Sequence, residues 1–290
     1  MVDHVLAVRC KLGEGPLWDW RTAILHWVDI DLHRIHCFDP ASGAHDQAEL
    51  PVAVGAIGLR AAGGLIAATR HGFAGWDWKS RTLTPIVDPE AGRPTRFNDG
   101  AVDSRGRFWA GTIALDPERY HIPDNHLYRL DPDGSVRRME SGLTISNGLD
   151  WSPDERTMYL TDTVAQKIYA YDFDVEGGTI GNRRDFVHTS DGPGYPDGLT
   201  VDAEGGVWSA RIAAGKIVRY DSQGRVEREV PLPVTCPTSC AFGGPALDRL
   251  YITTSWHILS EAEKTAQSQA GDLFSVPMTL KGRSAALFAG

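Results

Sequence analysis

The sequence predicts an all-β protein, a six-bladed β-propeller with four-stranded blades that spans residues 1–290 as a single domain. Three observations predict it. Short strand-like runs recur six times, and each is followed by a second run that ends in a turn. The turns contain the Asp, Pro and Gly residues of tight hairpins. No ten-residue stretch has sustained helical periodicity, and the nearest candidate, residues 260–269, is expected to form a short polar helix or loop.

The first runs of the six repeats are centred 39 to 50 positions apart, on residues 28, 67, 110, 160, 209 and 252. This spacing is typical of four-stranded propeller blades, and 290 residues allow about 48 for each blade. The first runs are residues 26–30, 65–69, 108–112, 158–162, 207–211 and 250–254. The second runs are residues 35–39, 73–78, 126–131, 167–172, 216–221 and 272–277.

Turn residues support the same register. Asp103 and Asp202 each begin an Asp-x-x-Gly turn directly before a strand run. Aspartate caps its own backbone in such turns and glycine accepts a positive φ, so both segments predict hairpins. A single blade cannot bury both faces of its sheet. Six blades packed around one axis are therefore expected to form one cooperative unit with a central channel.

Composition and charge exclude several classes of partner. Lys and Arg total 29 against 38 Asp and Glu, which gives a net charge of −9 and makes nucleic acid and anionic membrane surfaces unsuitable partners. Residues 1–14 lack the apolar segment and cleavage site of a signal peptide, so a cytoplasmic protein is expected. No apolar segment is suited to span a membrane. Four cysteines are too few for a disulfide framework, and Cys236 and Cys240 are expected to be buried free thiols.

Polar side chains precede four of the strand runs at an almost constant offset. Each lead oxygen stands 12 to 14 positions before the strand centre, in the residues Glu14, Asn98, Asn147 and Asp197. Equivalent positions of successive blades lie on a ring around the propeller axis. The constant offset therefore predicts that all four side chains point into one central mouth.

This ring contains two carboxylates and two amide oxygens. Hard divalent cations prefer such oxygen sets, whereas a structural zinc site needs Cys or His. The sequence therefore predicts a central metal site. The alternative is that the Asn-Gly and Asp-Gly pairs are hairpin turn signals that recur because hairpins recur.

At these same segments the sequence resembles the senescence-marker, gluconolactonase and luciferin-regenerating enzyme family, the regucalcin-like sugar lactonases. The matching motifs run in family order from near the first residue nearly to the last. They are Gly13-Glu14-Gly15-Pro16-Leu17-Trp18, Arg96-Phe97-Asn98-Asp99-Gly100, Ser146-Asn147-Gly148-Leu149-Asp150-Trp151-Ser152, Pro196-Asp197-Gly198 with Asp202-Ala203-Glu204-Gly205, and Thr238-Ser239-Cys240-Ala241-Phe242-Gly243-Gly244.

The resemblance implies a six-bladed propeller with one divalent metal ion, held by Glu14, Asn147 and Asp197. Calcium, zinc, manganese, iron(II) and magnesium all tolerate such a set. The resemblance also places Asn98 beside the metal, as a ligand or a substrate contact, and assigns Arg96 and Asp116 to the hydroxyl groups of a sugar. Glu118 is an alternative to Asp116, since the loop departs here from the family pattern. Residues 116–125 are expected to set substrate preference.

The reaction implied is hydrolysis of a sugar lactone, such as glucono-, xylono- or arabinonolactone, to the aldonic acid. The metal would act as a Lewis acid on the carbonyl oxygen, and Asp197 would deprotonate the attacking water as general base. Two alternatives remain open, a calcium-binding regulatory propeller and a propeller hydrolase that acts on a phosphotriester. The expected partner is a small-molecule lactone, and the sequence leaves the oligomeric state, the sugar and its ring size open.

Overall fold

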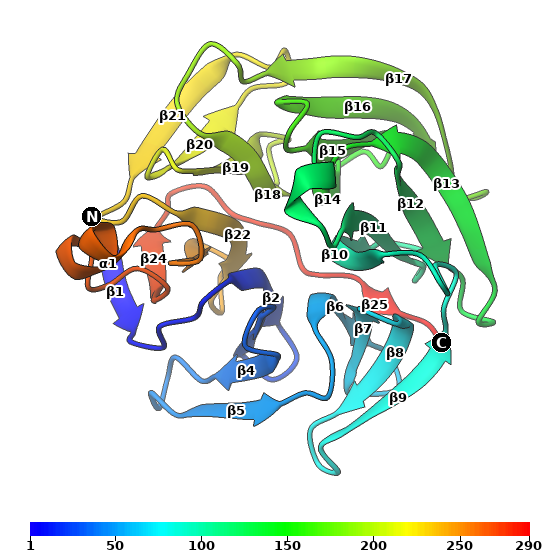
Figure 1. Cartoon of the computed structure of the whole chain (residues 1–290), viewed down its shortest axis with the longest axis horizontal. Helices are drawn as coiled ribbons and strands as arrows, with labels where there is room; N and C mark the ends of the chain where they lie inside the picture. Colours follow the sequence, from blue (N-terminus) through cyan, green and yellow to red (C-terminus); the bar gives the residue numbers. More distant parts are fainter.

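Six small sheets surround one central axis in the computed structural model, which describes residues 1–290 (Figure 1). Five of the sheets have four strands, and the sixth has a fifth, short strand added at its inner edge. Neighbouring strands in each blade are antiparallel and follow one another along the chain, apart from the strands that the two chain ends contribute. The structure confirms the predicted six-bladed β-propeller.

The first three blades contain twelve strands and a short 3-10 helix. In chain order these are β2 (Gly13–Asp19), β3 (Ile24–Asp29), β4 (Arg34–Phe38), β5 (His45–Glu49), β6 (Val54–Arg60), β7 (Leu65–Thr69), β8 (Gly72–Asp77), β9 (Thr82–Val87), β10 (Thr95–Val102), β11 (Phe108–Ala114), η1 (Pro117–Arg119), β12 (Asn125–Leu130) and β13 (Val136–Leu143).

The last three blades contain strands from the second half of the chain and one from its start. They are β14 (Ser146–Trp151), β15 (Thr157–Asp162), β16 (Lys167–Asp174), β17 (Thr179–His188), β18 (Tyr195–Val201), β19 (Val207–Ile212), β20 (Lys216–Tyr220), β21 (Val226–Pro231), β22 (Pro237–Gly243), β23 (Arg249–Thr254), α1 (Glu261–Ala266), β24 (Leu273–Pro277) and β1 (Asp3–Leu6). The short strand β25 (Leu287–Phe288) pairs in parallel with β6 of the second blade.

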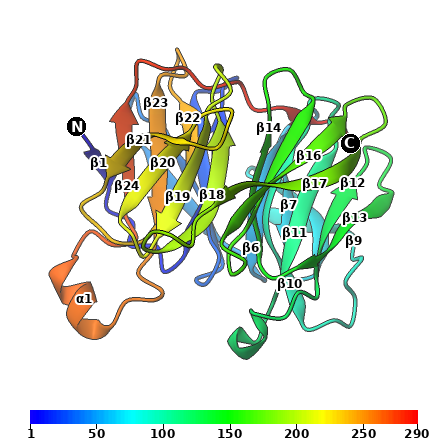
Figure 2. The ribbon, with the colours of Figure 1, turned by 90° about the horizontal axis from the view of Figure 1, so that it is seen from above.

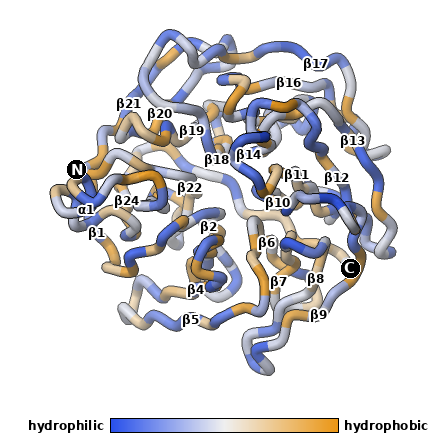
Figure 3. The backbone as a smooth tube through the Cα atoms, in the orientation of Figure 1, coloured by the Kyte–Doolittle hydropathy of each residue, from blue (hydrophilic) through white to orange (hydrophobic).

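Each predicted pair of runs corresponds to the second and third strands of a blade, as in β3 with β4 and β11 with β12. The first strand of every blade faces the axis, so that β2, β6, β10, β14, β18 and β22 contact one another in a ring. Apolar residues are concentrated in inner strands such as β6 and β7, whereas the outer strand β5 is largely hydrophilic (Figure 3).

The ring is closed by the two ends of the chain. Strand β1 adds to β24 as the outer strand of the last blade, with Asp3 opposite Ser275 and His4 opposite Phe274. Asp272 anchors this junction, because its buried carboxylate accepts hydrogen bonds from His4 Nε2 at 2.8 Å and from the amides of Val8 and Arg9 at 3.1 and 3.0 Å. The last blade is therefore built from both termini.

The hydrophobic core consists of six clusters, one for each interface between neighbouring blades. Trp18 of the first blade stacks on Tyr251 of the last, for example, and Trp109 of the third blade packs edge-on against Trp151 of the fourth. Burial of this kind contributes about 25 cal/mol for each Å² of apolar surface. No blade has a core of its own, so each one depends on both neighbours.

The two faces of the propeller differ. The loops that carry α1 and η1 project from one face, and the C-terminal segment crosses the other (Figure 2). On its way that segment makes backbone hydrogen bonds to the fifth and sixth blades through Lys281 and Gly282, and then to the third through Ala289. Helix α1 has six residues, and no helix in the chain has the length and apolarity needed to cross a membrane.

Two buried aspartates fasten the hairpin turns that the sequence identified. Asp202 is fully buried, and its Oδ2 accepts hydrogen bonds from Trp208 Nε1 at 2.8 Å and Arg219 Nε at 2.7 Å. Asp103 holds Trp109 and Arg107 in the same way in the third blade. Each aspartate thus joins a turn to the core tryptophan of the next strand.

We expect Asp202→Ala to lower the free energy of unfolding by about 3 kcal/mol, because it leaves Arg219 Nε and the Trp208 indole N–H buried without an acceptor, although Glu227 and Glu204 still pair with the rest of the guanidinium. Urea denaturation measures this. The matched control is Asp221→Ala, which removes a turn aspartate that pairs with the exposed Arg225 and is expected to cost much less than Asp202→Ala. Equal losses in both variants would contradict the role of the buried aspartate.

Candidate functional site

The predicted ring residues lie at irregularities in the innermost strands. Pairing with the second strand shifts between Glu14 and Leu17, and the corresponding shifts in other blades enclose Asn98, Asn147 and Asp197. A β-bulge redirects side chains and is common beside functional sites. The four polar side chains of the predicted ring are all buried, with 4 to 8% of their surface exposed.

The other two blades complete the ring without adding charge. Their bulges enclose Gly55 in β6 and Thr238 in β22. A Cβ on Gly55 would lie 2.4 Å from the carbonyl oxygen of Phe97, so only glycine lets β6 approach β10 here. Thr238 donates its hydroxyl to the carbonyl oxygen of Gly13. The carboxylate and amide side chains of the ring therefore come from the first, third, fourth and fifth blades.

Three buried carboxyl groups share this part of the channel. Burial raises the pKa of Glu14 well above its ordinary value, and the charges of Asp197 and Asp99 raise it further. Burial and the Asp99 charge likewise raise the pKa of Asp197. The pKa of Asp99 rises to about 6, chiefly because of burial. The structure thus brings together Glu14 and Asp197, which are 183 positions apart in the sequence, and adds Asp99 to them.

The two asparagines are held in place by hydrogen bonds to their surroundings. Asn147 Nδ2 donates to Thr163 Oγ1 at 3.1 Å, and the amide of Gly148 donates to Asn147 Oδ1 at 3.1 Å. Asn98 Nδ2 donates to the carbonyl oxygen of Ser146 at 3.0 Å, and Asn98 Oδ1 accepts from Arg96 Nη1 at 2.8 Å. Asn98 is therefore grouped with Arg96, whereas Asn147 is grouped with Asp197, whose pKa it lowers.

Arg96 is a partly buried cation beside the acidic ring. Burial lowers the pKa of its guanidinium, and the neighbouring Tyr120, Asp31 and Glu14 partly offset this effect. Asp31 accepts a hydrogen bond from His257 Nδ1 at 2.7 Å and lies 3.2 Å from Lys11 Nζ. The His257 hydrogen bond is the main reason that the pKa of Asp31 falls to about 2. The Arg96 guanidinium thus lies near the carboxylates of Glu14 and Asp31.

Asp116 and Glu118 occupy an exposed loop. Asp116 caps η1, and its Oδ1 accepts from the Glu118 amide at 3.0 Å. No hydrogen bond or ion pair joins Asp116 or Glu118 to Arg96. Tyr120, in the same loop, is near both Arg96 and Asp116, since the charges of both act on the pKa of its phenol. The structure therefore brings the loop near Arg96 through Tyr120 and places the Asp116 carboxylate farther out.

Two cavities flank the ring. A cavity of about 240 Å³ lies behind it, bounded by Asp99, by the inner strands and by residues 283–286 of the C-terminal segment. It contains the Arg283–Asp150 ion pair at 2.8 Å and neither Arg96 nor Asn98. A smaller cavity of about 160 Å³ lies beside the loop that carries η1. This second cavity contains Arg93, Arg119 and Asp124 and likewise neither Arg96 nor Asn98.

The donor set is chemically suited to a hard divalent cation. No three His, Cys, Asp or Glu side chains converge with the spacing of a metal site, and the predicted set instead combines two carboxylates with the amide oxygen of Asn147. Arg96, Asn147 and backbone amides lower the pKa of Glu14 or Asp197 by less than burial and the neighbouring carboxylates raise it, so the protein compensates their negative charge only in part. A bound cation would compensate it. Glu14, Asn147 and Asp197 are the residues that would hold the metal.

The sequence prediction missed Asp99, Tyr120 and Asp31. Asp99 had a detectable signal, because Glu14, Asn147 and Asp197 are each followed by glycine whereas Asn98 is followed by an acidic residue. Tyr120 and Asp31 had none, since their place near Arg96 depends on the paths of a loop in the third blade and of a loop in the first blade.

Comparison with known proteins identifies relatives over nearly the whole chain. The family model described as "SMP-30/Gluconolactonase/LRE-like region" matches residues 12–256. The chain is 38% identical to a pentonolactonase of Haloferax volcanii, over 97% of this chain and 96% of the relative. It is 37% identical to a 6-deoxy-6-sulfogluconolactonase of Pseudomonas putida, over 96% of this chain and 95% of the relative. The crystal structure of the calcium-binding protein regucalcin from Agrobacterium tumefaciens matches with a TM-score of 0.94 at 27% identity. The match covers 99% of this chain and 97% of that structure. These findings confirm the resemblance seen in the sequence.

We expect Asp99→Asn to stabilise the metal-free protein in a pH-dependent way. The Asp99 carboxyl titrates at about 6 in the folded chain and at 3.8 in the unfolded chain, so the folded state loses stability as pH rises through this window. The neutral amide of the variant would avoid a penalty on the order of 2 to 3 kcal/mol at about pH 8 and almost none at about pH 4. Urea unfolding at both pH values, with Asp221→Asn as control, checks this. A gain that is equal at both pH values would refute the electrostatic explanation.

Proposed function

We propose that this chain, which belongs to the SMP-30/gluconolactonase/LRE-like family, hydrolyses a sugar lactone to the corresponding aldonic acid. The observation that carries the proposal is the pairing of a buried carboxylate ring with the Arg96–Asn98 pair beside it. Relatives described as a pentonolactonase and a sulfogluconolactonase support the class of substrate. A lactone is neutral, so the acidic protein does not repel it.

A divalent cation held by Glu14, Asn147 and Asp197 would supply Lewis-acid stabilisation for the negative charge that develops on the lactone carbonyl oxygen. Its carboxylate ligands are fixed in place before substrate arrives, because the bulged inner strands hold them and little reorganisation is needed.

Asp197 is the proposed general base. Its carboxylate would accept a proton from the attacking water and return it to the ring oxygen as the ester bond breaks. Burial and the Asp99 charge make this carboxylate more basic than an exposed aspartate, which suits a proton acceptor working near neutral pH. The bulge at Pro196–Leu199 fixes the direction in which its side chain points.

Arg96, Asn98 and Asp116 are the proposed contacts with the hydroxyl groups of the sugar. Arg96 keeps donors free beyond the two bonds that its Nη1 makes to Asn98 Oδ1 and to the carbonyl oxygen of Phe97. These donors would fix the position of a polyhydroxylated ring next to Asp197, and positioning of this kind contributes strongly to rate. Asp116 is exposed and would reach the outer hydroxyl groups.

We expect Asp197→Asn to lower kcat/KM for gluconolactone, xylonolactone and arabinonolactone by about a thousandfold, because the amide cannot accept the proton. Circular dichroism should match the unaltered protein, since the two side chains have the same shape. Asp221→Asn, a change in a distant turn, is the control. Full activity in purified Asp197→Asn would rule out Asp197 as the base.

A chelator is expected to abolish lactone hydrolysis, and return of calcium, manganese, iron(II), zinc or magnesium one at a time is expected to restore it. Calcium binding without lactone turnover by any metal-loaded form would instead support a calcium-binding regulatory protein, the interpretation that the regucalcin structure favours. Initial rates on a phosphotriester are compared with those on the lactones. Phosphotriester rates more than about tenfold higher would favour the phosphotriester hydrolase, and any lower ratio argues against it.

A further inference from the structure

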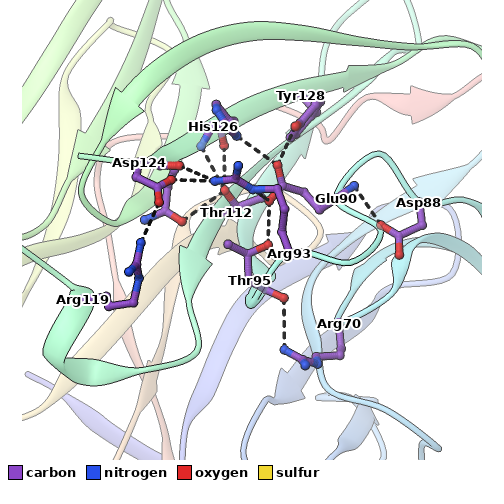
Figure 4. A network of polar contacts seen from close by, with 11 residues as sticks. Arg70, Asp88, Glu90, Arg93, Thr95, Thr112, Arg119, Asp124, His126 and Tyr128 are labelled. Carbon is purple, nitrogen blue, oxygen red and sulfur yellow. Dashed lines mark hydrogen bonds and ion pairs between the residues drawn. The ribbon is translucent and has the colours of Figure 1, made fainter. Parts of the chain in front are cut away.

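A polar network joins two loops beside the candidate site (Figure 4). The 88–94 loop connects β9 to β10 and ends two residues before Arg96. The 115–124 loop connects β11 to β12 and contains η1 with Asp116, Glu118 and Tyr120. One backbone hydrogen bond, from the amide of Leu115 to the carbonyl oxygen of Pro94 at 2.9 Å, joins the two loops directly.

Glu90 is the buried centre of this network. Its Oε2 accepts hydrogen bonds from Thr95 Oγ1 at 2.6 Å and Arg93 Nε at 3.0 Å. Its Oε1 accepts from Tyr128 Oη at 2.5 Å and lies 3.0 Å from His126 Nδ1. Burial alone would raise the pKa of Glu90, but the hydrogen bonds and the Arg93 charge hold it below its ordinary value. The carboxylate therefore stays ionised and ties the 88–94 loop to β10 and β12.

Arg93 links Glu90 to the 115–124 loop. Its Nη2 donates to Asp124 Oδ1 at 2.6 Å and to the carbonyl oxygen of Asp124 at 2.9 Å. Asp124 Oδ2 accepts from Arg119 Nη2 at 2.8 Å, and Arg119 directly precedes Tyr120. Both ends of the 115–124 loop are thus held, one by Pro94 and the other by Arg93.

We propose that Glu90 and Arg93 are positioning residues that set where the 115–124 loop stands relative to Arg96 and Asn98, and thereby set the preference among sugar lactones; this role in substrate choice rests on the proposed function. Neither residue needs to touch the substrate. Their hydrogen bonds are already made within the two loops and the strands that carry them. A displacement of about 1 Å in a substrate contact is enough to lower rates by up to a hundredfold.

The test compares Arg93→Gln with Arg105→Gln. Arg93 is partly exposed, so its replacement leaves Glu90 its three other partners and the chain folded. Arg105→Gln removes an exposed arginine of the third blade, away from both loops, that pairs with Glu176 of the fourth blade. We expect hydrogen exchange of the 115–124 peptide to speed up about fivefold or more in Arg93→Gln and to stay unchanged in Arg105→Gln.

Kinetics provide a second readout. KM for the best lactone of the panel should rise about tenfold in Arg93→Gln, with kcat within about twofold, because the base and the metal ligands are untouched. The double variant Arg93→Gln/Asp124→Asn should show a smaller effect than the sum of the two single variants, since both single changes remove the same Arg93–Asp124 ion pair. Arg93→Lys, which keeps the charge, should raise KM less than Arg93→Gln does.

Three results would overturn the proposal. They are unchanged exchange of the 115–124 peptide in Arg93→Gln, additive effects of Arg93→Gln and Asp124→Asn, and an equal response in Arg105→Gln. Hydrogen exchange does not depend on turnover, so it decides the positioning role even if the chain hydrolyses no lactone. In that case the exchange result stands and only the proposed function fails.

Discussion

The constraint on which the rest of the structure depends is closure of the ring of blades. Each hydrophobic cluster lies between two blades, so no blade is stable unless both neighbours are present. Strand β1 supplies the missing outer strand of the last blade, and Asp272 secures it. Closure brings six inner strands to one axis, and only there can residues from four blades share a site.

Closure also forces negative charges together. Glu14, Asp99 and Asp197 are buried in the same channel, where burial deprives them of water and their charges repel one another. The packing between blades must outweigh this repulsion. Functional sites commonly weaken their own fold in this way. The same group of carboxylates that destabilises the metal-free chain is suited to bind a cation and to accept a proton.

The strand pattern could be predicted because it is local. Alternating apolar runs, Asp-x-x-Gly turns and a constant offset before the strands recur along the chain, and the structure places the second and third strands where the runs indicated. Glu14, Asn98, Asn147 and Asp197 were found from that offset alone. Asp99 was missed because it breaks the repeat, and the partners of β1 and β25 were missed because they lie in blades far away along the chain.

The sequence by itself determined the number of blades, the four polar residues at equivalent inner-strand bulges and, through its motifs, the family. Only the tertiary structure decided which groups surround them. Tyr120 lies near Arg96, Arg93 links two loops and Asp31 pairs with His257 because segments that are far apart along the chain converge on one face. Such contacts leave no periodic pattern in the sequence. They follow from the order in which blades close around the axis, which is a property of the whole chain.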